Sequence, residues 1–341
     1  MTQILKKIKI TRKKPKNLKS EDDHLFNHEY SKTIEKSKVK IINNVYISDS
    51  KIKKFKYFRY MTKQWRMNPL TVKDKLSYFL TDLISLFQKN DNKETITIEK
   101  AIWAIDSRSN QYFHWLTDAM QRLESSKNFH SSHKIILTSA FSDYLYVEDS
   151  LDILGIEFIN LSSEKNYFVK ELVLAERVSP AGNFRKEIIK SIASRLKNNS
   201  RKNKKDISYE KVWVSRQNAE KRKIINFEQI EPLLKKQNFR ILEFENIKFS
   251  ETIEILKNCK IIGGVHGAGL TNMIFMNEYS KVIELRAHGD NKNNCFFSLA
   301  SDFDHDYYYF LGKSSSDNFY NGDLNINPEE FKEFLSSDDF N

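Results

Sequence analysis

The stretch that most constrains the fold of this chain runs from Lys260 to Asn272 and reads KIIGGVHGAGLTN. The two isoleucines at 261–262 favour a strand, and the segment after the glycines has the apolar character of a helix. Small residues in the connection allow a ligand to approach the backbone closely. The free N–H groups of a first helical turn favour an anion such as a diphosphate. A plain strand-to-helix connection explains a Gly-rich turn equally well, so the neighbouring segments decide the interpretation.

Strand and helix patterns alternate along the rest of the 341 residues. The expected strands are 41–47, 98–105, 134–137, 157–159, 171–175, 212–214, 239–244, 261–262, 281–285 and 307–310. The expected helices are 72–87, 112–123, 144–154, 187–196, 227–236, 251–258, 296–300 and 328–335. This alternation predicts an α/β fold with a largely parallel sheet. We expect two Rossmann-like domains facing a central cleft, with ligands beyond the carboxyl ends of the strands.

Charge suggests where the domains begin and end. The net charge is +11, and much of it lies at the N-terminus and near the middle of the chain. We interpret 1–38 as a basic flexible N-terminal arm and 197–207 as a basic linker. The segment 39–196 is then the N-terminal Rossmann-like domain, and 208–341 is the C-terminal one, which ends in a closing helix.

Cysteine usage and hydropathy favour a cytoplasmic protein. Cys259 and Cys295 give no disulfide framework, and no apolar segment of the kind found in secretory signals follows the basic N-terminus. The most apolar window, 76–87, is too short to span a membrane. We expect a cytoplasmic protein whose basic arm contacts the anionic inner face of the plasma membrane.

The positive charge also suggests an alternative function, nucleic-acid binding. Residues 51–66 interleave aromatic and basic side chains, a pattern that stacks on bases or sugars in some proteins. A packed, partly buried aromatic cluster is the commoner outcome, and no nucleic-acid motif accompanies the segment. We expect no nucleic-acid partner and keep this function only as the alternative.

Two arginines follow the expected strand at 212–214. Arg216 lies just beyond the carboxyl end of the strand, and Arg222 follows six residues later. Two planar guanidinium groups at such an edge form a charge-assisted clamp for phosphate oxygens, whereas the alternative is a solvated basic loop. If the sheet is parallel, this edge also carries the turn at His266, which favours the phosphate clamp.

Glu284 lies near the end of the strand 281–285. An acid at this place accepts hydrogen bonds from the ribose hydroxyls of a nucleotide in dinucleotide-binding folds. A structural ion pair with Arg286 or a nearby lysine is the alternative interpretation.

Polar and aromatic residues gather in the first half of the chain, at Asn110, Tyr112, His114, Trp115 and Asp118. His114 and Asp118 are four residues apart and therefore share a helix face. Either is a candidate general base, and Trp115 is a candidate for stacking on a sugar ring. Structural hydrogen bonds at a helix N-terminus are the alternative, and a metal site lacks a convincing third ligand.

The segment from Asp302 to Asp306 contains an Asp-x-Asp spelling that binds divalent metal in one class of sugar-nucleotide enzymes. It lies late in the chain, between a helix and the last expected strand, far from the start of a nucleotide-binding unit. We therefore interpret it as an acidic loop and expect no metal site.

Four blocks of this sequence resemble glycosyltransferase family 61, the DUF563 group. They occur in the family's order, and the block after Val265 is the most specific of them. The blocks are Asn110 to Asp118 (NQYFHWLTD), Val214-Ser215-Arg216 through Arg222, Val265 to Asn272 (VHGAGLTN) through Phe275, and Val282-Ile283-Glu284. The first hundred residues lie outside the resemblance.

The resemblance implies a GT-B-like fold and an inverting glycosyltransferase of the EC 2.4 class. It implies a nucleotide-sugar donor, with UDP the usual nucleotide, and no bound metal or other cofactor. Bacterial members serve capsule and lipopolysaccharide synthesis, so the implied acceptor is a glycan or a lipid-linked oligosaccharide. Carried over by position, the donor-binding residues are Arg216, Arg222, His266, Gly267, Ala268, Gly269, Asn272 and Glu284.

Inverting transfer needs a base that deprotonates the acceptor hydroxyl as it attacks the anomeric carbon. We expect Asp118 to be the catalytic base and His114 to be the second choice, with Asn110 and Trp115 on the acceptor side. Where the family has two adjacent arginines, this chain has the sequence 221–223 (KRK), which leaves open which side chain reaches phosphate. A related enzyme that transfers a non-sugar group such as pyruvate is the remaining alternative.

Overall fold

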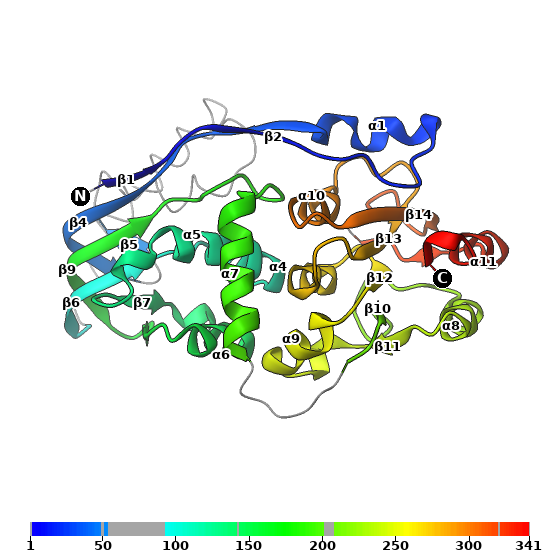
Figure 1. Ribbon diagram of the computed structural model, residues 1–341. Coiled ribbons are helices and arrows are strands. Elements are labelled where there is room, and N and C mark those ends of the chain that lie inside the picture. The colour runs from blue at the N-terminus through cyan, green and yellow to red at the C-terminus, as the bar shows by residue number, and fades with distance from the viewer. Residues whose placement is uncertain are drawn as a thin grey trace. The chain divides into compact units, whose positions relative to one another are not determined.

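The computed structural model describes residues 2–48, 51–53, 93–141, 143–200, 208–319 and 321–340. The chain forms two compact units, each an α/β structure (Figure 1). The first unit comprises Met1–Ile8 and Ile34–Ala181, and the second comprises Lys9–Thr33 and Gly182–Asn341. Most of the aromatic and basic segment at 51–66, and the whole helix expected at 72–87, lie outside the described residues.

The first unit is built on a seven-stranded sheet with the order β1-β4-β9-β6-β7-β8, in which β5 also pairs with β4. Its strands are β1 (Thr2–Leu5), β4 (Ser37–Ser48), β5 (Lys51–Lys53), β6 (Thr95–Trp103), β7 (Lys134–Leu137), β8 (Phe158–Asn160) and β9 (Asn166–Ala175). Its helices are α4 (Tyr112–His114), η3 (Trp115–Ala119), α5 (Met120–Ser125), η4 (Lys127–Phe129), η5 (Ser139–Phe141) and α6 (Leu145–Leu154).

This sheet is mixed, so the expected largely parallel sheet is wrong for the first half of the chain. Strands β9, β6, β7 and β8 are parallel neighbours, but β1, β4 and β5 pair antiparallel. In β4 the side chains of Val39, Val45 and Ile47 are buried, whereas Asn43 and Tyr46 are exposed. A strand that buries only one face is typical of an antiparallel sheet, and this alternation was the signal in the sequence.

The second unit is an open sheet with helices on both faces (Figure 1). The strand order is β11-β10-β12-β13-β14-β15, and every pair is parallel except β14 with β15. The strands are β10 (Lys211–Val214), β11 (Arg240–Leu242), β12 (Ile261–Val265), β13 (Lys281–Ala287), β14 (Asp306–Ser314) and β15 (Leu324–Asn325). This parallel sheet confirms the α/β interpretation of the second half.

Helices α8 and α11 cover one face of this sheet, and α9, η8 and α10 cover the other (Figure 1). The helices are α7 (Lys186–Asn199), α8 (Phe227–Lys236), η7 (Phe244–Asn246), α9 (Phe249–Lys257), η8 (Ala268–Phe275), α10 (Cys295–Asp302), α11 (Pro328–Leu335) and η9 (Asp338–Phe340). Within the described ranges, no helix combines the length and apolar character needed to cross a bilayer.

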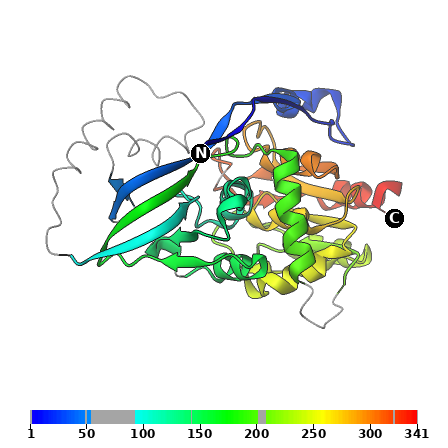
Figure 2. The same cartoon turned by 60° about the vertical axis from the view of Figure 1, so that its left-hand side comes forward.

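The N-terminal segment is ordered structure, so the flexible arm expected at 1–38 is wrong. Strands β2 (Ile8–Thr11) and β3 (Ser31–Ile34) pair, with η1 (Ser20–Asp22), α1 (Asp23–Phe26) and η2 (Asn27–Glu29) between them (blue in Figure 2). Leu25 and Phe26 are buried, and the Phe26 ring lies 5.3 Å from that of Phe297 and 5.0 Å from that of Tyr309. The dense lysines hid these few apolar anchors, whose burial is enough to fix the segment.

The units divide between Ala181 and Gly182, not in the linker expected at 197–207. Helix α7 belongs to the second unit because its buried face, which includes Ile189 and Leu196, packs there with η8 and α9. Residues 201–207 are outside the described part of the chain. Basic composition was therefore a poor guide to the boundary.

The Gly-rich turn after β12 is a place of close packing. A Cβ atom on Gly263 would lie 2.6 Å from the Trp213 ring, and one on Gly269 would lie 2.5 Å from Val214 Cγ1. Gly263 thus makes room on β12 for the Trp213 ring, and Gly269 lets η8 approach β10. The helix expected after the turn is present as the 3-10 helix η8.

We expect Gly269→Ala to destabilise the protein by about 1–3 kcal/mol, because the new methyl group overlaps Val214. Urea unfolding measures the loss. Val214→Ala in the same chain removes the overlapping atom, so the double variant should be more stable than the sum of the two single effects. Strictly additive effects would contradict the proposed overlap.

Candidate active-site residues in each unit

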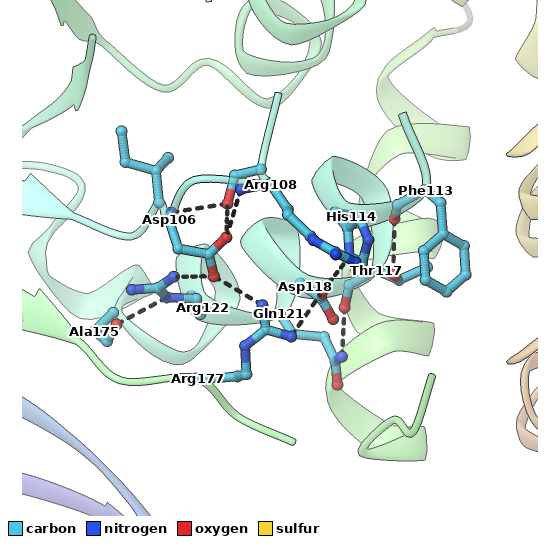
Figure 3. Close-up of polar contacts among 12 residues, drawn as sticks. Asp106, Arg108, Phe113, His114, Thr117, Asp118, Gln121, Arg122, Ala175 and Arg177 are labelled. Atoms are coloured by element: carbon cyan, nitrogen blue, oxygen red, sulfur yellow. Dashed lines mark hydrogen bonds and ion pairs between the residues drawn. The ribbon is translucent and has the colours of Figure 1, made fainter. Parts of the chain in front are cut away.

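In the first unit, one helical segment holds the predicted base candidates. Helix α4 passes into the π-helical η3 at Trp115, and such interruptions are frequent at functional sites. His114 Nδ1 lies 2.7 Å from Asp118 Oδ2 (Figure 3). The His114 side chain is 12% exposed and that of Asp118 only 1%. Sequence reasoning thus paired the right residues, but only the histidine reaches solvent.

Two arginines hold the carboxylate of Asp118 and a second buried carboxylate, Asp106 (Figure 3). Arg177 donates to Asp118 Oδ2 at 2.9 Å and to Asp106 Oδ2 at 2.8 Å. Arg122 donates to Asp106 Oδ2 at 3.2 Å and to the Ala175 carbonyl at 2.9 Å. Two positive and two negative groups therefore balance inside the fold.

The arginines control the ionisation of this cluster. Burial raises the pKa of Asp106, but Arg122 and Arg177 outweigh it and lower this pKa to about 2. Burial also lowers the pKa of Arg177, but Asp118 and Asp106 outweigh it, so this pKa is raised. Burial lowers the pKa of Arg122 to about 10. At neutral pH the arginines are charged and Asp106 is ionised.

The geometry favours His114 over Asp118 as the group that meets a substrate. Asp118 Oδ2 is already shared by His114 and Arg177, and the side chain is almost fully buried. Among the described residues, His114 Nε2 has no hydrogen-bond partner. The arrangement matches a histidine base that is oriented by a carboxylate at its other nitrogen.

Trp115 is a core residue, so its expected role in stacking on a sugar is wrong. It is 0% exposed, and its indole Nε1 donates to Ser150 Oγ at 2.8 Å. Asn110 is half-buried, and its backbone carbonyl accepts a hydrogen bond from the Tyr146 hydroxyl. An acceptor-side role for the Asn110 side chain stays a prediction.

In the second unit, the expected donor residues converge on one sheet edge. Parallel pairing of β10 with β12 sets Val214 opposite Gly264, so the turns after both strands share that edge. Arg216 lies against Gly267, where a Cβ atom would come within 2.6 Å of Arg216 Nη1. Arg222 Nη1 donates to the His266 carbonyl at 3.0 Å.

The structure also separates the three basic residues at 221–223. Arg222 adopts a left-handed backbone conformation with φ of 60° and turns toward His266. A non-glycine residue in this region is uncommon and marks a constrained site. Lys221 instead donates to Asn321 Oδ1 at 2.9 Å. Arg222 is thus the basic residue of this segment that contacts the turn.

The charge around Arg216 is unbalanced. Burial and the neighbouring Arg222 lower the pKa of Arg216, while Glu245 acts in the opposite sense. No acidic side chain forms an ion pair with Arg216 among the residues that the structure describes. Two arginines beside the free N–H groups at the start of η8 suit an anion such as a phosphate.

Glu284 and Asn272 do not offer the contacts expected of them. Glu284 is 0% exposed, its Oε1 accepts from His266 Nδ1, and its Oε2 accepts from the Tyr307 hydroxyl at 2.5 Å. Since Glu284 is fully buried and both of its oxygens already accept hydrogen bonds, it is not accessible to a ribose. Asn272 is fully buried, whereas Ala268 and Gly269 keep partial exposure.

The Asp-x-Asp spelling is divided between two environments. Asp304 accepts from Lys186 and Lys190, each at 2.6 Å, whereas Asp302 is buried. Over the described ranges, no group of three or more His, Cys, Asp or Glu residues is placed to hold a metal ion.

A sequence model of the family Glycosyltransferase 61 matches residues 112–283, slightly more than half of the chain. This chain belongs to the glycosyltransferase 61 family. The chain is therefore a transferase enzyme, and the matched segment includes the site residues His114, Asp118, Arg216, Arg222 and His266. Glu284 follows directly after it.

Two curated relatives of this family 61 chain are animal enzymes. The EGF domain-specific O-linked N-acetylglucosamine transferase of Bos taurus is 30% identical over 95 residues, which cover 26% of this chain and 18% of that protein. The enzyme of the same name from Gallus gallus is also 30% identical over 95 residues, with 17% of its length covered. The similarity thus spans less than a fifth of each relative.

Sequence reasoning missed the buried partners of both histidines. These partners are Asp106, Arg122, Arg177 and Tyr307, whereas the ion pair of Glu284 with Arg286 was the alternative interpretation of the sequence. A signal existed for two of them, because Asp106 and Arg177 follow the parallel strands β6 and β9 at one sheet edge. The rule on strand ends that located Arg216 therefore applies to the first unit as well.

Burial raises the pKa of Asp302 to about 7, although Arg12, Lys186 and Lys190 act to lower it. Between about pH 4 and 7 the folded state therefore keeps a proton that the unfolded chain releases. The free energy of unfolding falls as pH rises through this window.

We expect Asp302→Asn to remove this loss of stability at higher pH. Relative to the wild type, the variant should gain on the order of 1–4 kcal/mol between pH 4 and pH 8, measured by urea unfolding. Asp304→Asn is the matched control, because its lysine partners lower the pKa of Asp304 and its stabilisation is lost at low pH instead. Parallel stability curves for wild type and Asp302→Asn would exclude a buried, titrating Asp302.

Proposed function

We propose that this enzyme transfers a sugar with inversion, and that His114 is the catalytic base. The observation that carries the proposal is the His114–Asp118 pair, whose carboxylate is held by Arg177. The bond from His114 Nδ1 to Asp118 leaves Nε2 to accept the proton of the acceptor hydroxyl. That oxygen attacks the anomeric carbon while the bond from this carbon to the donor phosphate breaks. Asp118 is a positioning residue in this scheme.

The donor in our proposal is a UDP-sugar whose diphosphate lies beside Arg216, Arg222 and the turn from His266 to Gly269. The electron pair of the breaking bond goes to the diphosphate, so negative charge grows there during transfer. Arginines and backbone N–H groups already aimed at this position stabilise that charge. The unbalanced charge of Arg216 supports this assignment.

We extend the proposal to the finer properties that the resemblance implies. The enzyme has the GT-B arrangement, with the donor in the second unit and the acceptor on the first. Arginine charge replaces a metal ion at the leaving group. The acceptor is a glycan or lipid-linked oligosaccharide of a bacterial surface polysaccharide, and transfer takes place in the cytoplasm at the inner face of the membrane.

The two base candidates are separated by His114→Gln and Asp118→Asn. We expect His114→Gln to lower kcat for hydrolysis of a UDP-sugar, with water as acceptor, by about 10²–10⁴, because a general base contributes that much. The loss in Asp118→Asn should be smaller, since the histidine remains but its orientation is weakened. Steady-state kinetics on a panel of UDP-sugars that includes UDP-N-acetylglucosamine give both values.

His133→Gln is the matched control. This buried histidine of the first unit also pairs with a carboxylate, Glu171, at 2.9 Å, but it lies outside the cluster around Asp106. It should leave kcat unchanged. Full activity in His114→Gln together with an inactive Asp118→Asn would assign the base to Asp118 instead.

Donor binding is tested by Arg216→Ala and Gly267→Ala. Each should raise the Kd for UDP by about 10–100-fold, the first by removing charge-assisted hydrogen bonds and the second by displacing the guanidinium. Calorimetry with and without EDTA measures Kd, and EDTA should not change it. The exposed Arg240→Ala is the control, and UDP binding by Arg216→Ala at the wild-type affinity would contradict the donor site.

A further inference from the structure

The second unit contains a buried polar chain that ends at His266. Glu284 joins His266 Nδ1 through Oε1 and the Tyr307 hydroxyl through Oε2. Arg286 Nη1 donates to the Tyr307 oxygen at 3.3 Å and lies 3.7 Å from Glu284 Oε2. These contacts join the turn after β12 to strands β13 and β14.

Every residue of this buried polar chain except His266 is shielded from solvent. Arg286 is 1% exposed, its Nη2 donates to the Asp290 carbonyl at 2.8 Å, and its guanidinium lies 4.9 Å from the centre of the Phe26 ring. Burial and the charge of Glu284 hold the pKa of the Tyr307 hydroxyl well above its usual range, so the hydroxyl keeps its proton and donates it. The positive charge of Arg286 and the negative charge of Glu284 balance each other.

His266 is the end of the buried polar chain that reaches solvent. Its side chain is 14% exposed, and the Phe296 ring lies edge-on at 4.9 Å. Since Nδ1 is bonded to Glu284, the ring has only Nε2 to offer, and that atom has no hydrogen-bond partner among the described residues. A histidine–carboxylate pair with a purely structural role would not need a ring nitrogen that is left without a partner.

We infer that Glu284 and Tyr307 are positioning residues that keep the Nδ1 proton of His266 in place and aim Nε2 at the donor diphosphate, to which Nε2 donates a hydrogen bond once it also carries a proton. The inference rests on the proposed function for the ligand, but the state of the ring is a property of the free enzyme. It gives Glu284 a role through His266 instead of the ribose contact expected from the sequence. It also assigns roles to a strand, β14, and to a segment around Phe26 that lie outside the part matched by the family.

Tyr307→Phe is the gentlest variant, because it removes one hydroxyl and keeps the ring. We expect it to weaken UDP binding severalfold, up to about tenfold, because Glu284 loses one of its two anchors. The matched control is Tyr309→Phe, which removes a similar buried hydroxyl bond, from Tyr309 to Asp22 Oδ2 at 2.6 Å, without touching Glu284. The control should bind UDP like the wild type.

Glu284→Gln removes the charge and allows the amide to donate to the ring instead of accepting from it. It should raise the Kd for UDP by about 10–100-fold, since small displacements of a positioned group have large effects. Asp302→Asn controls for the loss of a buried carboxylate in the same unit. Thermal unfolding of each variant shows whether it is folded at the temperature of the binding assay.

The decisive readout is the protonation of the His266 ring, observed by NMR on 15N-histidine-labelled enzyme without ligand. His266→Asn assigns the signals by their loss. We expect a protonated Nδ1 in the wild type and both controls, and an altered pattern in Glu284→Gln and Tyr307→Phe. An unprotonated Nδ1 in the wild type, or an unchanged pattern in Glu284→Gln, would overturn the inference.

These outcomes are distinct from failure of the proposed function. A wild-type enzyme that binds no UDP would overturn the donor assignment and leave the NMR result to decide how Glu284 acts on the ring. Normal UDP binding by a folded Glu284→Gln would overturn the positioning role while the glycosyltransferase proposal stood.

Discussion

The physical constraint on which this structure depends is that a buried carboxylate needs a positive partner. Asp106 and Asp118 in the first unit are held by Arg122 and Arg177, and Glu284 in the second lies beside Arg286. Removing one partner of such a pair leaves an uncompensated buried charge, which costs about 3–5 kcal/mol. The ion pairs that hold each site are therefore also needed for the stability of the fold.

The same constraint explains why each histidine has a defined orientation. A carboxylate that is fixed by arginine offers its remaining lone pairs in fixed directions, so the imidazole that binds it is fixed too. His114 and His266 both bind through Nδ1 and both keep partial exposure. The two histidines to which we assign chemistry are thus the outermost members of chains of buried polar groups.

The sequence predicted what depends on local pattern and on parallel pairing. The alternation of strands and helices predicted that β10 and β12 end at one edge of the sheet. This was enough to place Arg216 and His266 near each other. Sequence reasoning failed where distant segments meet, as for the contact of Phe26 with Arg286 and for Tyr307 as a partner of Glu284. Lysine content concealed the ordered N-terminal segment, and Trp115 was judged by residue type although burial decides its role.

Charge balance gives the two histidines different chemistry despite their similar support. Around His114 two arginines face two aspartates, so the local charge nearly cancels and Nε2 lies where a neutral hydroxyl can approach. Around His266 the arginine and glutamate of the buried chain also cancel, but Arg216, which has no ion-pair partner among the described residues, adds positive charge at the turn. A neutral acceptor therefore suits the first histidine, and an anionic leaving group suits the second. The proposed assignment of base and donor sites rests on this difference in electrostatic field, since the hydrogen bonds of the two histidines are nearly the same.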